Sequence, residues 1–229
     1  MLILALETST ELGSCALWCD GSVLERFCPA GRSHSETLLP LIRELLAEAG
    51  TTVAALDGIA FGAGPGAFTG LRVACGAAQG LAVASDRPLL PVCSLEAMAL
   101  QAGDGQVLAL LDARMGEAYV ARYRCTGSEC QLAGEIRVLA PEVIALPEET
   151  GWRACGNAPA AYPVLAARLQ AAGIELLPGI LPTAAAVARL AAPRLGRGEG
   201  MDAALAAPLY IRDKVAKTVA ERLEEGGRA

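Results

Sequence analysis

The sequence predicts an α/β protein with two lobes, and three observations support this fold class. The chain has 229 residues, which is enough to form two small hydrophobic cores. Hydrophobic residues make up 53% of it and charged residues 19%, so apolar burial can offset the entropy lost on ordering, which excludes a disordered chain. Strand and helix patterns alternate along the chain, and one strand-turn-strand pattern occurs twice.

The predicted elements follow from apolar runs bounded by turn residues and from stretches with a helical repeat. The first part predicts strands at 2–6, 14–19, 23–28, 58–61 and 89–92, and helices at 35–49, 69–84 and 94–101. The second part predicts strands at 131–139 and 152–155, and helices at 158–170 and 183–195. We expect Ser33 or Ser35 to cap the first helix and Ser94 to cap the third. The linker Gly103-Asp104-Gly105 divides the chain into lobes at 1–103 and 104–229, with the last segment free to pack back on the first lobe.

A strand-turn-strand pattern occurs once in each lobe. Residues 4–17 read "LALETSTELGSCAL" and residues 108–121 read "LALLDARMGEAYVA". In both, an apolar strand reaches an acidic residue, Glu7 or Asp112, and a polar turn with a glycine leads to a second strand. The match is either an internal duplication or chance. Two lobes that each open with such a hairpin are the plan of actin-like ATPases, with ribonuclease H-like mixed sheets flanked by helices.

In actin-like ATPases the two hairpin turns face each other and hold the phosphates of a magnesium nucleotide. The residues here depart from that chemistry, because Glu7 stands where an aspartate organises the magnesium ion. The dipeptide Gly156-Asn157 is either a remnant of an adenosine-binding turn or an ordinary turn. We therefore expect a vestigial site at Glu7, Asp112, Gly156 and Asn157, with no required cofactor and at most weak binding of ATP or ADP. The alternative is an active ATP-dependent phosphotransferase with the nucleotide bound between Glu7 and Asp112.

Residues 62–82, "GAGPGAFTGLRVACGAAQGLA", raise the question of a phosphate-binding loop. A P-loop needs a lysine followed by serine or threonine, and neither the lysine nor the spacing is present. The glycines instead predict a tight turn between a strand and a helix. In that helix Arg72 and Gln79 fall on one narrow line, and the other directions are apolar, so something besides one sheet must cover it.

The preceding helix carries an apolar arc of about 160°, wider than contact with its own sheet requires. We therefore interpret the two helices as a partner surface. Its predicted residues are Leu38, Leu41, Ile42, Leu45, Leu46, Leu71, Ala74, Cys75 and Ala78. Leu41 and Leu46 lie at opposite flanks of the arc, so one of them should face outward. The alternative is that the second lobe and the C-terminal segment of the chain cover these helices.

The composition excludes several classes of function. With one histidine, His34, and no C-x-x-C pair, the chain offers no zinc site, and the sequence predicts no catalytic residues. Its eight cysteines are expected to be small core thiols. The net charge of −6 gives no field that attracts nucleic acid, so a role with RNA would need a basic partner. The apolar runs fall short of the roughly 20 residues of a membrane span, and a cytoplasmic protein is expected.

Five segments together resemble the bacterial TsaB family, formerly YeaZ, which takes part in making threonylcarbamoyladenosine in tRNA. They are "LALETST", "HSETLLPLI", "GIAFGAGPGAFTGLRVACGAAQGLA", "LLDARMGEAYVARY" and "APLYIRD", and the resemblance spans residues 2–213. It implies a non-catalytic scaffold that pairs with the catalytic subunit TsaD, lets the ATPase TsaE join, forms homodimers and meets tRNA only through the complex. TsaD binds a metal through a histidine pair, which a chain with His34 alone lacks. The older name of glycoprotease finds no support in these residues.

Overall fold

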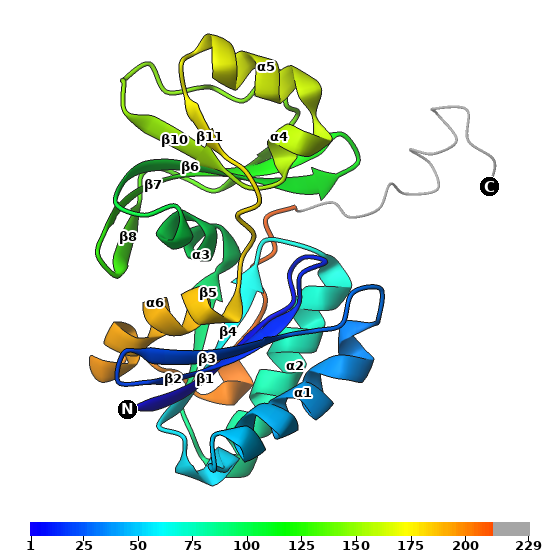
Figure 1. The fold of residues 1–229 in the computed structure, drawn as a ribbon, viewed down its shortest axis with the longest axis vertical. Helices are drawn as coiled ribbons and strands as arrows, with labels where there is room; N and C mark the ends of the chain where they lie inside the picture. The colour runs from blue at the N-terminus through cyan, green and yellow to red at the C-terminus, as the bar shows by residue number, and fades with distance from the viewer. Residues whose placement is uncertain (213–229) are drawn as a thin grey trace, which may run out of the picture.

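Two mixed β-sheets, one in each lobe, organise the computed structural model of the protein, which describes residues 1–212 (Figure 1). Sheet A has the strand order β3-β2-β1-β4-β5. Its strands are β1 (Leu2–Glu7), β2 (Ser14–Cys19), β3 (Ser22–Phe27), β4 (Gly58–Gly64) and β5 (Leu89–Cys93). Residues 213–229, with the end of the "APLYIRD" segment, lie outside the described residues.

Sheet B has the order β11-β10-β6-β7-β8, and β9 pairs with β7. Its strands are β6 (Gly105–Arg114), β7 (Glu117–Thr126), β8 (Glu129–Leu132), β9 (Arg137–Leu139), β10 (Trp152–Cys155) and β11 (Glu175–Leu177). In both sheets an antiparallel hairpin stands beside a parallel strand: β1 pairs with β2 and β4, and β6 pairs with β7 and β10. The two lobes therefore share one arrangement, which agrees with the predicted α/β class.

Helices separate and cover the two sheets. They are α1 (His34–Glu48), α2 (Phe68–Ser85), α3 (Ser94–Gln101), α4 (Ala158–Ala161), α5 (Pro163–Ala171) and α6 (Ala184–Gly196), with short 3-10 turns η1 (Val53–Ala55) and η2 (Ala203–Leu205). Side chains alternate across β1, so Leu4 and Leu6 pack in the core with α1 and α2, whereas Ile3 and Ala5 pack in the core with α6. Helices α4 and α5 cover the outer face of sheet B (Figure 1).

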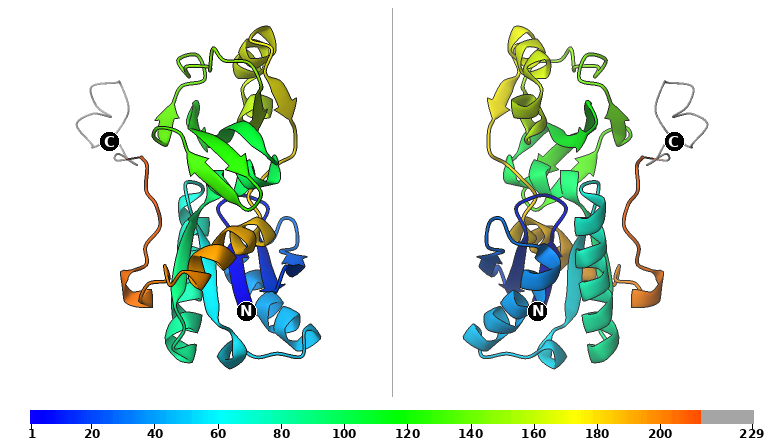
Figure 2. Two further views of the ribbon diagram at one scale, coloured as in Figure 1. Left: turned by 90° about the vertical axis from the view of Figure 1, so that its left-hand side faces the viewer. Right: turned by 90° about the vertical axis from the view of Figure 1, so that its right-hand side faces the viewer.

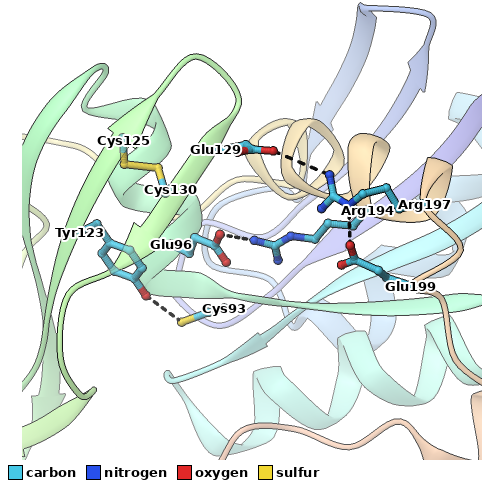
Figure 3. A network of polar contacts seen from close by, with 9 residues as sticks. All are labelled: Cys93, Glu96, Tyr123, Cys125, Glu129, Cys130, Arg194, Arg197 and Glu199. Carbon is cyan, nitrogen blue, oxygen red and sulfur yellow. Dashed lines mark hydrogen bonds and ion pairs between the residues drawn. A yellow bond between two sulfur atoms is a disulfide. The ribbon is translucent and has the colours of Figure 1, made fainter.

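Helix α3 lies between the lobes and belongs to both cores. Leu95 and Met98 pack against sheet B, and Ala97 packs in the core that contains α6. Figure 3 shows the polar contacts beside it: Glu96 of α3 pairs with Arg194 of α6, and Arg197 approaches Glu129 of β8 at 3.7 Å. Burial raises the pKa of Glu96, and Arg194 acts in the opposite direction. These contacts join the two lobes around one short helix.

The chain after α6 returns along the first lobe. Met201 pairs with Leu89 at the edge of sheet A, and η2 lies beside α2 (Figure 2). The Gln79 side chain of α2 donates hydrogen bonds to the carbonyls of Ala203 at 2.9 Å and Ala206 at 3.1 Å. This segment therefore covers a side of α2 that the sheet leaves open. Among residues 1–212, no helix combines the length and apolar character needed to cross a membrane.

Several predicted elements need correction. The strand expected at 131–139 is two strands, β8 and β9, because Gly134 takes a φ of 105° between them. The helix expected at 158–170 is broken into α4 and α5 at Tyr162, which is extended before Pro163. Strand β11 was not predicted, because it has only three residues and two of them are exposed, so it carries no alternation.

The prediction of eight core thiols is also wrong. Cys125 and Cys130 form a disulfide across the β7–β8 hairpin, where the antiparallel register places them directly opposite each other with their Cα atoms 4.1 Å apart. The other six cysteines are free. Of the predicted serine caps, one has the predicted position. Ser33 is the N-cap residue of α1, although its side chain makes no cap hydrogen bond. The N-cap of α3 is Cys93, and Ser94 is the first residue of the helix.

Candidate functional site

A cleft of about 400 Å³ opens between the two lobes. Its walls are the turn after β1, the start of α1, the start of α2 and the hairpin β6–β7, with lining residues in 8–11, 32–35, 66–73 and 111–114 and at Tyr119 and Asn157. Both predicted hairpins therefore end near this cleft. The cleft is the candidate functional site of the chain.

The turn after β1 packs directly on the first turn of α2. The Thr8 hydroxyl donates to the Gly70 carbonyl at 2.7 Å, and the Ala67 amide donates to the Ser9 carbonyl at 2.7 Å. A Cβ on Gly70 would lie 1.8 Å from the Thr8 carbonyl oxygen, and one on Gly66 would lie 2.4 Å from that of Ser9. Glycine is therefore required by close backbone approach, and these residues fix α2 against the cleft.

Glu7 does not line the cleft. Its side chain is fully buried, with the Ser9 amide donating to Oε1 and the Ser94 hydroxyl of α3 donating to Oε2 at 3.0 Å. Gly62 on β4 leaves the necessary room, because a Cβ there would lie 1.9 Å from Oε2. Burial raises the pKa of Glu7, against the effect of the hydrogen bonds from Ser9 and Ser94. The carboxylate therefore holds the turn in place through these two hydrogen bonds, from inside the lobe.

Asp112 and Asn157, in contrast, lie together in the cleft wall. The Asp112 carboxylate accepts hydrogen bonds from the Arg114 amide at 2.8 Å and the Tyr162 hydroxyl at 2.7 Å, and it pairs with the Arg114 guanidinium at 3.2 Å. The Asn157 side-chain oxygen accepts from the Asp112 amide at 2.8 Å. Burial, followed by the hydrogen bond to Asp112, raises the pKa of Tyr162 to about 12. Gly156 has a φ of 114° and stands directly before Asn157. Of the four predicted vestigial residues, the structure thus brings together all but Glu7.

Other cleft residues escaped the sequence reasoning, chiefly Ser9, Thr69 and Arg114. The polar run "ETST" at the end of β1 was the available signal for Ser9, but it fixed no direction for the side chain. His34, the one histidine of the sequence, also lines the cleft, and its Nε2 lies 2.9 Å from the Thr10 carbonyl oxygen. Within residues 1–212, no group of three histidine, cysteine, aspartate or glutamate side chains could hold a metal ion.

The predicted partner-binding residues are core residues of this chain, which corrects their placement. Eight of them are at most 7% exposed: Leu38, Ile42, Leu45, Leu46, Leu71, Ala74, Cys75 and Ala78. Leu41 is partly buried against the same core. The physical reason is the C-terminal segment around Ala206, which covers α2 in addition to the sheet and α1. The wide apolar arcs thus serve packing within the lobe.

The outer faces of α1 and α2 expose a different set of side chains. Leu39 is 54% exposed and Val83 is 72% exposed. Gly76 and Gly80 are exposed on α2, and a Cβ at either position would meet nothing within 4 Å. The outer face of α2 therefore carries two glycines beside an exposed valine.

Comparison with known proteins gives one consistent family. Residues 29–219 match the family described as "TsaD: tRNA N6-adenosine threonylcarbamoyltransferase". The chain is 36% identical to the tRNA threonylcarbamoyladenosine biosynthesis protein TsaB of Escherichia coli (strain K12), over 94% of this chain and 96% of the relative. It is 44% identical to TsaB of Haemophilus influenzae over 53% of each chain.

Solved structures support the same fold. A Pseudomonas aeruginosa protein described as similar to peptidase YEAZ matches with 40% identity and a TM-score of 0.83, covering 92% of this chain and 99% of its own. Component A of the (R)-2-hydroxyglutaryl-CoA dehydratase of Acidaminococcus fermentans matches with 8% identity and a TM-score of 0.51, covering 87% and 99% of the two chains. The second likeness concerns the actin-like fold alone.

Proposed function

Because the chain belongs to the TsaB family, whose members are biosynthesis proteins for tRNA threonylcarbamoyladenosine, we propose that it is a non-catalytic scaffold subunit of this pathway. In this proposal it pairs with a TsaD-type catalytic subunit, allows a TsaE-type ATPase to join, and meets tRNA only through the complex in the cytoplasm. It needs no cofactor of its own.

The observation that carries the proposal is the orientation of Glu7. A carboxylate that organises magnesium has to reach the metal or its waters, whereas that of Glu7 is buried and bound by Ser9 and Ser94. The cleft then retains one acidic residue from the hairpin pair, Asp112, and Arg114 and Tyr162 already contact it. This arrangement favours a scaffold over a phosphotransferase.

For the partner contact we propose the outer faces of α1 and α2, in the heterodimer and in a homodimer alike. Gly76 and Gly80 allow a partner backbone to approach closely, and Leu39, Leu41 and Val83 supply apolar contact beside them. This proposal keeps the partly buried Leu41 from the residues predicted from the sequence and replaces the buried ones with exposed residues on the same two helices.

Co-purification with a TsaD-type protein, followed by a tRNA modification assay that omits each protein in turn, tests the scaffold role. We expect a stable pair, and modification that stops when this chain is left out. The phosphotransferase alternative is tested by titrating the isolated chain with magnesium and ATP. Turnover of ATP by the isolated chain would establish it in place of the scaffold.

A further inference from the structure

The end of the described chain, residues 209–212, connects the two lobes at one side of the cleft. The segment follows η2 on the first lobe and runs toward the second lobe (Figure 2). It lines a pocket of about 190 Å³, whose other walls are the start of α2 in the first lobe and the hairpin β6–β7 in the second. The residues that line both this pocket and the cleft are Gly66, Ala67, Ala113, Arg114 and Tyr119. The segment therefore lies directly beside the cleft.

The first half of the segment is attached to the first lobe. The Leu209 amide donates a hydrogen bond of 2.7 Å to the Ala63 carbonyl near the end of β4. Arg72 Nε of α2 donates to the Tyr210 hydroxyl at 3.2 Å, and the ring centroids of Tyr210 and Phe68 are 5.7 Å apart. A strand carbonyl and an aromatic pair thus hold Leu209 and Tyr210 on this lobe.

The second half is attached to the second lobe. Ile211 packs against the core of sheet B. The Arg212 guanidinium pairs with the Glu117 carboxylate at the start of β7 and donates to the Ala113 carbonyl at 3.3 Å. Because the Arg212 side chain is only 17% exposed, this pair is partly shielded from water and stabilises the contact more than a pair on the open surface would. Four consecutive residues therefore contact both lobes.

The contacts around α3 form the other junction between the lobes, and they lie away from the cleft. The Glu96–Arg194 and Glu129–Arg197 pairs belong to this junction (Figure 3). Among residues 1–212, α3 contributes none of the residues that line the cleft. A rotation of the lobes about α3 would therefore change the distance between the cleft walls, and an attachment beside the cleft opposes that rotation.

We propose that residues 209–212 form a strap that holds the two lobes at one angle and so sets the width of the cleft, and that the Arg212–Glu117 pair is the contact through which the strap is released. Without this pair, the strap keeps weaker contacts with the second lobe: the packing of Ile211 and the hydrogen bonds of Arg212 to the Ala113 carbonyl and the Met115 sulfur. The strap acts within the isolated chain and does not depend on the proposed scaffold role.

The matched variants are Glu117→Ala and Glu129→Ala. Each removes the carboxylate of a glutamate of sheet B that pairs with an arginine at a lobe junction, Arg212 in the strap or Arg197 near α3. Chymotrypsin cleavage of the full chain after Tyr210, followed by mass spectrometry, measures release of the strap. We expect Glu117→Ala to accelerate this cleavage at least about fivefold and Glu129→Ala to change it less than about twofold.

Residual dipolar couplings of the backbone amides measure the orientation of sheet A relative to sheet B. We expect one alignment tensor to fit both lobes in the wild type and in Glu129→Ala, and each lobe of Glu117→Ala to need its own tensor. Arg212→Ala removes the same pair from the strap and should behave like Glu117→Ala, so it decides the outcome if Glu117→Ala fails to fold. Circular dichroism checks the fold of all three variants.

Three results would each overturn the strap. The first is a wild type whose two lobes already need separate tensors. The second is a folded Glu117→Ala or Arg212→Ala variant that keeps the wild-type lobe orientation or the wild-type rate of cleavage after Tyr210. The third is a Glu129→Ala variant whose lobes reorient as much as those of Glu117→Ala, since release would then not be specific to the strap.

Discussion

Two glycine-to-alanine substitutions in α2 should change stability in opposite directions. The Cβ introduced by Gly70→Ala would lie 1.8 Å from the Thr8 carbonyl oxygen, about 1.6 Å short of ordinary van der Waals contact at 3.4 Å. The neighbour is backbone, so α2 and the turn after β1 must move apart. That movement breaks the hydrogen bonds from the Thr8 hydroxyl to Gly70 and from the Ala67 amide to Ser9, both 2.7 Å long.

Each of these hydrogen bonds contributes about 1 kcal/mol, and the lost packing adds a similar amount. Gly70→Ala should therefore lower the free energy of unfolding by about 3 kcal/mol. Gly76→Ala, in the middle of the same helix, meets nothing within 4 Å and should raise it by about 0.5 to 1 kcal/mol, because alanine is the better helix former. Urea denaturation followed by circular dichroism measures both. If Gly70→Ala proves as stable as Gly76→Ala, the close approach of the turn to α2 is refuted.

Three further predictions concern the first lobe and the cleft. Leu46→Asp, at a position that is 7% exposed, should cost about 4 to 6 kcal/mol of folding stability. Leu41→Asp, at a partly buried position, should cost about 1 kcal/mol and weaken pairing with a TsaD-type protein. Thermal melts measure the stability of both variants, and a pull-down with a TsaD-type protein measures the pairing. Burial raises the folded-state pKa of Glu7. The wild type should therefore gain stability relative to Glu7→Gln as the pH falls toward 4.5, and it should lose that gain as the pH rises. Urea denaturation across this pH range measures the difference, and equal pH profiles for the two proteins would contradict the prediction. Asp112→Ala should leave tRNA modification by the assembled complex within about threefold of wild type, and a loss of two orders of magnitude with the fold intact would restore the phosphotransferase alternative.

Most of the fold could be predicted because it depends on local patterns. The strands at 14–19 and 152–155 and the helix at 94–101 have the predicted boundaries, since alternation and apolar runs are continuous there. The errors at Gly134 and Pro163 arise where a single backbone preference interrupts an otherwise continuous pattern. Such breaks are visible in the sequence but compete with the stronger hydrophobic signal.

The placement of the apolar helices could not be predicted, because it depends on contacts between distant parts of the chain. The wide apolar faces of α1 and α2 indicated correctly that something in addition to their own sheet covers these helices. The identity of the cover depends on η2, which lies more than a hundred residues after α2 and reaches Gln79 through the carbonyls of Ala203 and Ala206. A periodicity measures how much of a helix is covered, and it contains no information about which segment covers it.

The two hairpins show why only one of the two acidic residues predicted for the cleft lies there. Their sequence patterns correspond, yet Glu7 points into its lobe and Asp112 stands at the cleft. Glu7 keeps a regular register opposite Ser14, whereas the pairing of β6 and β7 shifts between Asp112 and Arg114, and Arg114 takes a φ of 61°. A shift of this kind redirects a side chain. Gly62 beside Glu7 opens space for the inward carboxylate, so the direction of each acidic side chain is set by its neighbouring strand and by register, which the repeated pattern does not encode.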